Sequence, residues 1–322
     1  MRKIATVFIF LLLTTSTFAQ ISKTKITEKK NIISTKPYDS LKNFLESNVY
    51  GYVNQNLYLL EQSESLRKYG YRDFVVDYLL RDYYDKSNVY KGYGNHSSRY
   101  EDLNGRYFKV LGVHPHPRQE YDKLLYGKTF FLELEEQKTK DTVFFKYNAE
   151  SENSFPFLVT GFYEKQKKML VNKKFVFTNR ILRVSSGSGL DITTGKPLTI
   201  KTGEKWTCID LTVEEKYFSL SLVVRNSLGE TTVVSYDSVF DDRKFAYTSE
   251  QAYRCITKFG SINFNLILQG LVKIGMTSEM CKLSLGEPIK INKTISAGRN
   301  SEQWVYEKNY LYFENNILTT IQ

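Results

Sequence analysis

The chain has 322 residues, with 45 lysines and arginines against 35 aspartates and glutamates, and a formal net charge of +10. Hydrophobic residues make up 41% and charged residues 25%, a globular balance with enough apolar surface for real cores. The positive charge is compatible with anionic partners, but it is spread along the chain without an arginine-rich block. A nucleic-acid-binding protein is therefore not expected.

Residues 1–19 have the layout of a secretory signal peptide. Arg2 and Lys3 form a basic start, Ile4–Leu13 is almost wholly apolar, and Ala19 is a small residue before the expected cleavage site. The apolar run is short for a membrane span, although an N-terminal anchor that stays uncleaved is the alternative. No cysteine follows Ala19 to carry a lipid. We therefore expect an exported protein, periplasmic or secreted, that is not a lipoprotein.

Residues 20–104 are predicted to hold a loose leader and a helical region. The leader, 20–36, is rich in Lys, Thr and Ser and has no periodicity. Apolar residues at steps of three and four predict one helix between residues 41 and 60 and a second over Arg72–Tyr83. The first set is Leu41, Phe44, Leu45, Val49, Val53, Leu57 and Leu60. Asp85–Asn104 is rich in Gly, Asn and Ser and is predicted to be an exposed loop.

Two β-rich modules, 105–180 and 181–262, are predicted next, each ending in a helix. Runs at Phe130–Leu134 and Thr142–Tyr147 flank a polar turn and indicate a hairpin. Three pairs of segments suggest that the modules are related. They are KTFFLEL (128–134) with KWTCIDL (205–211), VFFKY (143–147) with TVVSY (232–236), and FYEKQKKML (162–170) with AYRCITKFG (252–260). Chance similarity between two apolar hairpins is the alternative.

All three cysteines, Cys208, Cys255 and Cys281, lie in the C-terminal half of the chain. An exported protein can hold disulfides, and three thiols allow one intramolecular bridge with one thiol left over. Cys208 and Cys281 lie among apolar residues, so each could equally be a buried free thiol. Both alternatives stay open at this point.

The segment GMTSEMCKLSLGEP, Gly275–Pro288, predicts a short helix with both ends marked. Thr277 is an N-cap residue, and the helix dipole favours Glu279 in the first turn. Gly286 can adopt the left-handed conformation that ends a helix, and Pro288 prevents the helix from resuming. A helix of about two turns does not persist alone in water, so we expect it to pack on another element.

The next segment, QWVYEKNYLYFENNILTTIQ, predicts three antiparallel strands. They are expected over Trp304–Glu307, Tyr310–Phe313 and Ile317–Ile321, with asparagines in both links. In the middle strand the two tyrosines face one way, while Leu311 and the phenylalanine face the other. We expect the short helix to pack on this sheet in a self-contained α+β module over residues 263–322.

The sequences GMTSEM, LGEP, WVY and YLYFENNIL, in this order, resemble the module of the SmpA/OmlA family. These are BamE-like outer-membrane assembly factors, related in fold to β-lactamase-inhibitor proteins. The resemblance covers about Leu271–Gln322 and implies a module for protein–protein contact in the bacterial envelope, without catalytic residues. The chain departs from the family in lacking a lipid-bearing N-terminal cysteine and in the long stretch ahead of the module.

His114 and His116 are the closest histidine pair and would share a side of an extended chain. A metal site would need a third ligand, such as Glu120 or Asp122. A polar loop turn is the alternative, and we expect no metal and no cofactor. No Ser/His/Asp or Cys/His nucleophile can be assembled from sequence order.

Glu133, Glu135 and Glu136 offer acids on one strand, and the first two would project on one face as paired acids in a glycosidase do. A solvated strand face explains them more simply. The stretch Glu164–Lys174 carries five lysines and would suit lipid headgroups or an anionic polymer. The ordinary exposed face of a packed helix is the alternative.

Tyrosine is common, with 24 copies, and several lie around the predicted loop. These are Tyr83, Tyr84, Tyr90, Tyr93 and Tyr100. Exposed aromatic rings stack on sugars or anchor protein interfaces, whereas a Tyr-rich background would give similar clusters without function. Six aromatic residues are the candidate interaction surface. They are Trp304, Tyr306, Tyr310, Tyr312, Tyr90 and Tyr93.

The sequence therefore predicts an α+β fold with N-terminal helices, two β-rich modules and a helix-plus-meander module. We expect an exported, non-enzymatic envelope protein that contacts another, unidentified envelope protein, with peripheral membrane contact as an additional possibility. A glycan- or peptidoglycan-binding protein that uses the β modules and the Tyr-rich loop is the alternative. A hydrolase, with paired acids or a metal, is the third hypothesis.

Overall fold

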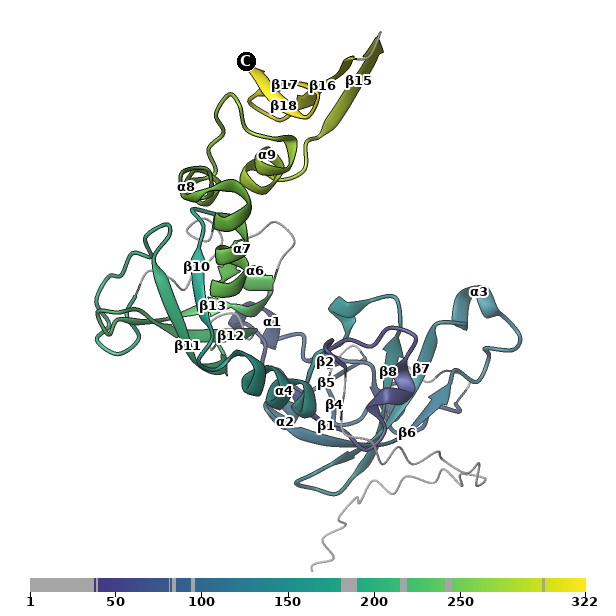
Figure 1. Cartoon of the computed structure of the whole chain (residues 1–322). Coiled ribbons are helices and arrows are strands. Elements are labelled where there is room, and N and C mark those ends of the chain that lie inside the picture. Colours follow the sequence, from purple (N-terminus) through teal and green to yellow (C-terminus); the bar gives the residue numbers. More distant parts are fainter. Residues whose placement is uncertain are drawn as a thin grey trace, which may run out of the picture.

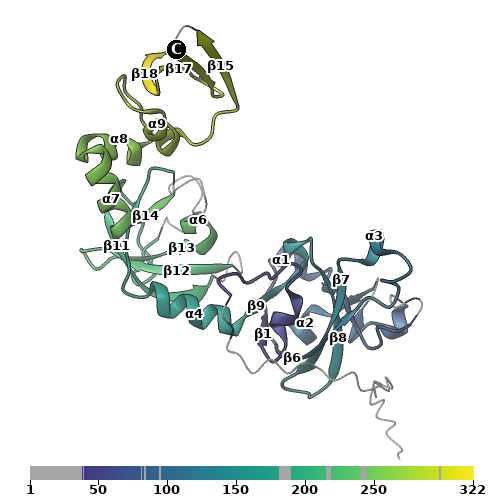
Figure 2. The same ribbon diagram turned by 45° about the vertical axis from the view of Figure 1, so that its right-hand side comes forward.

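The computed structural model describes residues 38, 40–80, 82, 85–93, 96–180, 190–214, 219–240, 245–296 and 299–322. The predicted signal peptide and leader lie outside these residues, as do Tyr83 and Tyr84. The fold is α+β, as predicted: helices accompany four antiparallel sheets of six, five, four and three strands. The three larger sheets follow one another in chain order in space, with the C-terminal sheet farthest from the first (Figures 1 and 2). No described helix combines the length and the apolar character needed to cross a membrane.

The first sheet has the strand order β3-β8-β7-β6-β1-β9. Its strands are β1 (Asn56–Leu59), β3 (Phe74–Val75), β6 (Tyr107–Pro115), β7 (Thr129–Glu136), β8 (Thr142–Asn148) and β9 (Phe157–Val159). The hairpin predicted from the sequence is β7 with β8. A one-turn helix, α3 (Lys123–Tyr126), lies in the connection between β6 and β7, and α4 (Thr160–Leu170) follows β9 directly.

The two helices predicted for residues 41–60 and for Arg72–Tyr83 are wrong. The described part of this region holds single turns and short strands instead. They are η1 (Val49–Tyr52), α1 (Glu64–Arg67), β2 (Tyr71–Arg72), η2 (Lys86–Asn88), β4 (Gly92–Tyr93), β5 (Ser97–Ser98) and α2 (Tyr100–Leu103). The apolar spacing misleads because Phe44, Val49 and Leu57 reach one core from a loop, a 3-10 turn and a strand. Asp85–Asn104 is not an exposed loop either, since Val89, Tyr90, Tyr100 and Leu103 are buried.

The second sheet has the order β13-β12-β11-β10-β14. Its elements are β10 (Lys174–Phe177), β11 (Lys205–Val213), β12 (Leu220–Arg225), β13 (Thr231–Ser235), α6 (Tyr236–Phe240), β14 (Ala246–Thr248) and α7 (Ser249–Phe259). A capping box between Thr248 and Gln251 fixes the start of α7, because each side chain accepts a hydrogen bond from the other's backbone N–H.

The two sheets repeat one topology. In the first, β1 pairs with β6 and β9, and β6, β7 and β8 form a meander. In the second, β10 pairs with β11 and β14, and β11, β12 and β13 form a meander. In both, a three-residue strand runs directly into an eleven-residue helix. The sequence match of β8 with β13 and of α4 with α7 agrees with this order, but β11 corresponds to β6 and not to β7.

The correspondence extends to single hydrogen bonds. Asn54 and Asn172, each two residues before the first strand, both have positive φ values, of 67° and 70°. The Asn54 N–H donates to Val110 O, and the Asn172 N–H donates to Cys208 O. Val110 and Cys208 are both the fourth residue of a nine-residue strand, and in both strands the register to the next strand shifts after that residue. We conclude that the two units are built on the same backbone plan.

The C-terminal sheet has four strands in the order β15-β16-β17-β18, one more than predicted. The elements of this part are α8 (Ser261–Gln269), α9 (Ser278–Leu285), β15 (Lys290–Ser296), β16 (Arg299–Val305), β17 (Tyr310–Glu314) and β18 (Ile317–Ile321). The predicted short helix is α9: the Thr277 hydroxyl accepts from the Met280 N–H at 3.2 Å, and Gly286 ends the helix with a φ of 87°. It packs on the meander as expected, with Met280 and Cys281 in one core with the buried side chains of β16, β17 and β18.

The sheets do not follow the predicted module boundaries. The boundary at 104/105 separates β1 and β3 from strands of their own sheet, and the boundary at 180/181 separates β10 from the second sheet. The boundary at 262/263 falls inside α8. The C-terminal module is not self-contained, because its core includes Val176 and Tyr247 of the second sheet.

Candidate functional site

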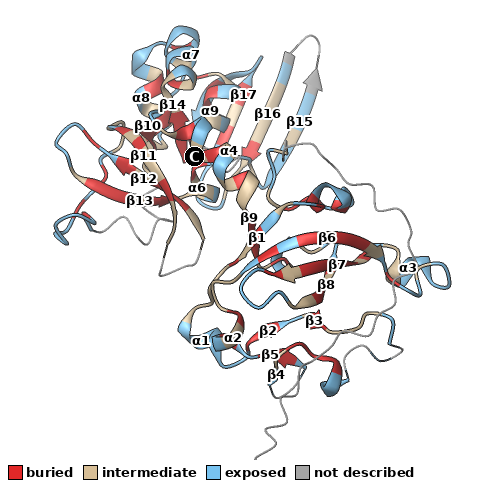
Figure 3. Ribbon diagram, turned by 90° about the horizontal axis from the view of Figure 1, so that it is seen from below, coloured by how far each residue is buried: buried red, intermediate tan, exposed pale blue. Residues whose placement is uncertain are grey.

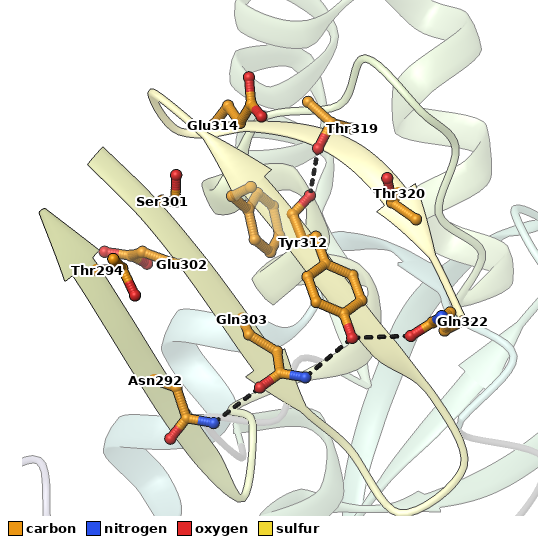
Figure 4. A pocket seen from close by; sticks show the side chains of 11 residues that line it. Asn292, Thr294, Ser301, Glu302, Gln303, Tyr312, Glu314, Thr319, Thr320 and Gln322 are labelled. Carbon is orange, nitrogen blue, oxygen red and sulfur yellow. Dashed lines mark hydrogen bonds between the residues drawn. The ribbon is translucent and has the colours of Figure 1, made fainter. Parts of the chain in front are cut away.

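A hollow with polar chemistry lies on the open face of the C-terminal sheet (Figure 4). It is a groove of about 610 Å³. Eight of its eleven lining residues are neutral and polar, and the other three are Glu302, Phe313 and Glu314; the eight are Asn292, Thr294, Ser301, Gln303, Tyr312, Thr319, Thr320 and Gln322. All four strands of the sheet contribute to it.

Strand register places these side chains together. Asn292 of β15 is opposite Gln303 of β16, which is opposite Tyr312 of β17, which is opposite Thr320 of β18. Side chains directly opposite one another in neighbouring strands share a face of the sheet. The residues between them in sequence, such as Leu311, point to the core shared with α9.

A chain of hydrogen bonds crosses the sheet in the floor of the groove (Figure 4). The Asn292 amide donates to Gln303 Oε1 at 2.8 Å, and Gln303 Nε2 donates to the Tyr312 hydroxyl at 3.0 Å. The Tyr312 hydroxyl in turn donates to Gln322 Oε1 at 2.8 Å. Gln303 and Tyr312 each donate one bond and accept another, so the row of four side chains is held in a fixed orientation across the sheet.

Two carboxylates lie in the groove, the exposed Glu314 and the largely buried Glu302. The Trp304 indole N–H, at 2.8 Å, and the Lys293 ammonium, at 3.0 Å, hold the pKa of Glu302 below its usual range despite partial burial. Glu302 is therefore an ionised and paired carboxylate. The hydrogen-bonded row of Asn292, Gln303, Tyr312 and Gln322, called the relay below, consists of neutral amides and a phenol. This part of the groove therefore suits a polar, uncharged partner.

One edge of this sheet is open. The edge at β18 is closed by the chain itself, since the Gly275 N–H donates to Leu318 O and the Leu318 N–H donates to Met276 O. Among the described residues, no backbone group pairs with the outer side of β15, which is seven residues long. An edge strand of this kind presents unpaired N–H and C=O groups.

The other long sheets have shorter or closed edges. Beside β3, the Val76 N–H donates to Asn88 O, and beside β13, the Ile192 N–H donates to Thr231 O. The Asn43 side chain bonds to both Phe157 O and the Val159 N–H on the outer side of β9. β14 has only three residues. Of the described sheet edges, β15 therefore offers the longest uncovered one.

The structure divides the predicted C-terminal aromatic residues between core and surface. Trp304 is buried against Phe313, with ring centroids 4.6 Å apart, and is not part of an accessible surface. Tyr306 is half-buried and donates from its hydroxyl to Gly286 O at 2.9 Å, and burial raises its pKa. Tyr310 is exposed and Tyr312 lies in the groove, so only these two remain as surface candidates.

The predicted Tyr-rich loop surface is wrong for most of its described members. Tyr90 is buried and donates to Asp141 Oδ2 at 2.7 Å, and burial raises its pKa. Tyr100 is buried and stacks on Tyr71, at a centroid distance of 5.8 Å. Tyr93 is exposed, with the Arg99 guanidinium 5.2 Å from its ring centroid.

The two histidines lie close to β7 but have separate partners. His114 Nε2 is 2.8 Å from Glu133 Oε2, and its ring stacks on Tyr78. His116 is buried and stacks on Tyr126 at 4.0 Å, and burial, aided by nearby Lys146 and Arg118, lowers its pKa to about 4. In the described part of the chain, no three His, Cys, Asp or Glu side chains are grouped so that they could hold a metal ion.

The three glutamates of β7 do not form a solvated strand face. Glu133 is buried against His114, and Glu135 is 3.0 Å from the Lys140 ammonium. Glu136 is fully buried and accepts hydrogen bonds from the backbone of Lys138 and Thr139, which fix the β7–β8 turn. Each acid has its own structural partner, so this strand presents no pair of free acids.

The basic stretch Glu164–Lys174 spans the end of α4 and the start of β10, as the sequence suggests. Two of its lysines bind neighbouring elements: Lys167 is 2.7 Å from Asp210, and Lys173 is 3.2 Å from Glu250. These two charges therefore join α4 and β10 to β11 and α7, as expected for a packed helix.

All three cysteines are free thiols. Burial raises the pKa of Cys208 to about 11 and that of Cys281 to about 12, so both stay protonated near neutral pH. Cys255 is partly exposed and lines a small pocket of about 240 Å³ between α7 and α9. The open choice between a disulfide and free thiols is thus resolved in favour of free thiols.

Apart from Tyr312, the polar members of the groove are not predicted from the sequence. Asn292 and Thr294 alternate with Ile291, Lys293 and Ile295, and Ser301 and Gln303 alternate with Glu302 and Trp304, but β15 is not among the predicted strands. Once β15 is recognised, this period-two pattern is the signal that marks the face. No protein-family model, curated protein or solved structure matches this chain.

Proposed function

We propose that this chain is an exported, non-enzymatic envelope protein whose C-terminal unit binds an extended segment of another protein. The segment would pair with β15 as an additional strand. The observation that carries the proposal is the open edge of β15, in a molecule that closes or shortens its other described sheet edges.

The groove supplies the second part of such a contact. In strand addition, main-chain hydrogen bonds give affinity, and alternate side chains of the added strand reach the face of the sheet. The face next to β15 carries Asn292 and Gln303, held by the relay through Tyr312. These neutral amides favour a segment with polar, uncharged side chains facing the groove.

A photo-reactive residue in place of Thr294, on the open edge, tests the proposal in envelope extract. The matched control carries the same residue in place of Ile317, which is also exposed but lies on the edge paired with Thr277. We expect a partner to cross-link from position 294 and not from position 317. A synthetic peptide of the cross-linked segment should then slow amide hydrogen exchange in β15. Equal cross-linking from both positions, or unchanged exchange in β15, contradicts the proposal.

The amide and hydroxyl lining of the groove also favours a second candidate, a glycan ligand. Sugars bind through hydrogen bonds to such groups and through contact with an aromatic ring, and Tyr312 supplies both. Under this alternative, the protein sediments with insoluble cell wall, and Tyr312→Phe weakens binding about fivefold because one net hydrogen bond is lost. The control is Tyr253→Ala, which changes a tyrosine of α7 that is 71% exposed and does not line the groove. Sedimentation that Tyr312→Phe leaves unchanged excludes the groove as a glycan site.

A further inference from the structure

The connection between β6 and β7 carries three outward apolar side chains at its tip. Tyr121 is 90% exposed, Leu124 is 100% exposed and Leu125 is 64% exposed. They lie in and just before α3, which projects from the end of the strand pair and is exposed in the burial view (Figures 1 and 3). Three large apolar side chains exposed together at one tip mark a candidate contact surface, because burying them against a partner would be favourable.

This tip is held by its own bonds. The Asp122 carboxylate accepts from the Leu125 N–H at 2.9 Å, and Gln119 Nε2 donates to Gly127 O at 3.0 Å. Tyr126 stacks on the buried His116 ring, with planes only 5° apart. At Gly127 a Cβ atom would lie 2.3 Å from Lys123 O, so the turn requires glycine. These bonds keep the apolar side chains outward and prevent their collapse onto the sheet.

Basic residues surround the apolar tip. Arg118, Lys123 and Lys128 outnumber the two acids of this connection, Glu120 and Asp122, and the whole chain carries a net charge of +10. Lys123 lies 3.8 Å from Glu120, and the Asp122 carboxylate caps α3, so the connection as a whole has a surplus of one positive charge. The remaining positive charge complements an anionic surface.

We infer that the α3 tip, residues 118–128, inserts into the surface of an anionic lipid bilayer. A bilayer accepts a convex apolar tip without a preformed pocket, and it places tyrosine and basic residues at the headgroup level while leucines enter the acyl region. Tyr121, Leu124 and Leu125 are the exposed apolar side chains of the tip, whereas Lys128 directly precedes β7 and Arg118 lies three residues after β6. The site is distinct from the β15 edge and does not depend on the function proposed for it.

Co-sedimentation of the full chain with lipid vesicles tests the inference. The probes are vesicles of phosphatidylcholine alone and of phosphatidylcholine with an equal part of phosphatidylglycerol. We expect binding to the anionic vesicles and a loss of at least about tenfold in partitioning for the double variant Leu124→Asp, Leu125→Asp. The matched control is Leu228→Asp, because Leu228 is 77% exposed in the β12–β13 turn of the second unit. That variant should bind as the unchanged chain does.

Other results overturn the inference. If the double variant retains its binding, the vesicles are held by surface charge alone and the tip does not insert. If the unchanged chain does not bind anionic vesicles even at low salt, the tip has no affinity for lipid. If the anionic vesicles fail to compete with a protein that cross-links to position 124, the tip is a protein-binding surface instead. Circular dichroism of each variant checks that the fold is kept.

Discussion

The Asn43 side chain takes the place of a neighbouring strand at the β9 edge of the first sheet. Its amide donates to Phe157 O at 2.7 Å and accepts from the Val159 N–H at 2.8 Å, so it satisfies both backbone groups on the outer side of β9. Backbone polar groups that lose water on folding need such partners. No local pattern in the sequence distinguishes Asn43 from other polar residues, because its partners are more than a hundred positions away.

Replacing Asn43 by alanine should lower the free energy of unfolding by about 2–3 kcal/mol, because two partly buried backbone groups lose their partners. Urea unfolding followed by circular dichroism measures this. The control is Asn56→Ala, which removes an exposed side chain–side chain bond to Gln137 and should change stability by less than about 0.5 kcal/mol. A similar loss in both variants would mean that Asn43 does not close this edge.

His116 makes stability depend on pH. Its pKa is about 4 in the folded chain, against 6.5 for an unperturbed histidine, because it is buried near Lys146 and Arg118. The unfolded chain therefore binds a proton first, and the folded chain loses stability as the pH falls from about 6.5 to about 4, by on the order of 3 kcal/mol. Urea unfolding across this range, compared with His116→Gln, measures the effect. The variant should lack most of the decline between pH 6.5 and 4.5, and an equal decline would contradict the prediction.

Residues whose roles are local were predictable, and those whose roles depend on distant packing were not. Thr277 and Gly286 were correctly placed at the two ends of α9, since capping needs only neighbouring residues. Tyr90 and Trp304 were expected at a surface, but both are buried by elements far away in the sequence. The groove is predicted in part: Tyr312 is a candidate from the sequence, whereas Asn292 lies in the missed strand β15 and Gln303 in the part of β16 that precedes the predicted strand Trp304–Glu307.

At the scale of elements, the errors have one cause. Between residues 41 and 60 the apolar residues fit a helical period, yet β1 forms there because it fills the space between β6 and β9. β1 has only four residues, too few for the two-residue alternation of a strand to stand out against the three-to-four-residue spacing of a helix. Longer runs such as β7 and β8 were predicted correctly because their own sequence carries several periods.

The asparagines that lie two residues before β1 and before β10 give a testable prediction for both strands. Asn54 and Asn172 adopt the left-handed backbone conformation, which asparagine tolerates better than alanine. Asn172→Ala should therefore destabilise the chain by about 1 kcal/mol, whereas Asn172→Gly should be close to neutral. Thermal unfolding of both variants and of the Asn54 pair gives the comparison. If alanine and glycine are equivalent at either site, the positive φ is not required there.

At the scale of the whole molecule, the core joins parts that the sequence suggested were separate. Val176 and Tyr247 lie on the side of the second sheet that faces α7 and α8, and they share a core with α9 and the C-terminal strands. The α+β class and the helix-plus-meander unit could be predicted from local patterns. The boundaries could not, since they are set by pairings such as β1 with β6 and by this shared core.

The two tryptophans report on this continuity, because Trp206 is buried in the second unit and Trp304 in the C-terminal unit. In Trp206→Phe the fluorescence reports on Trp304, and in Trp304→Phe it reports on Trp206. Once each variant's overall stability has been measured by circular dichroism and corrected for, the two fluorescence midpoints in urea should be the same. Two separate midpoints within one variant, one by fluorescence and one by circular dichroism, would show that the C-terminal unit unfolds independently.

The passage from α4 to β10 takes only three residues, and all three are bonded: the Val171 N–H to Lys167 O, the Asn172 N–H to Cys208 O, and the Lys173 N–H to Leu170 O. Every residue of this connection is hydrogen-bonded, so we expect the first two units to keep a fixed orientation relative to each other. A force applied to the first unit is therefore transmitted to the second. A ligand bound by the first unit would then keep a fixed distance and direction relative to the second unit.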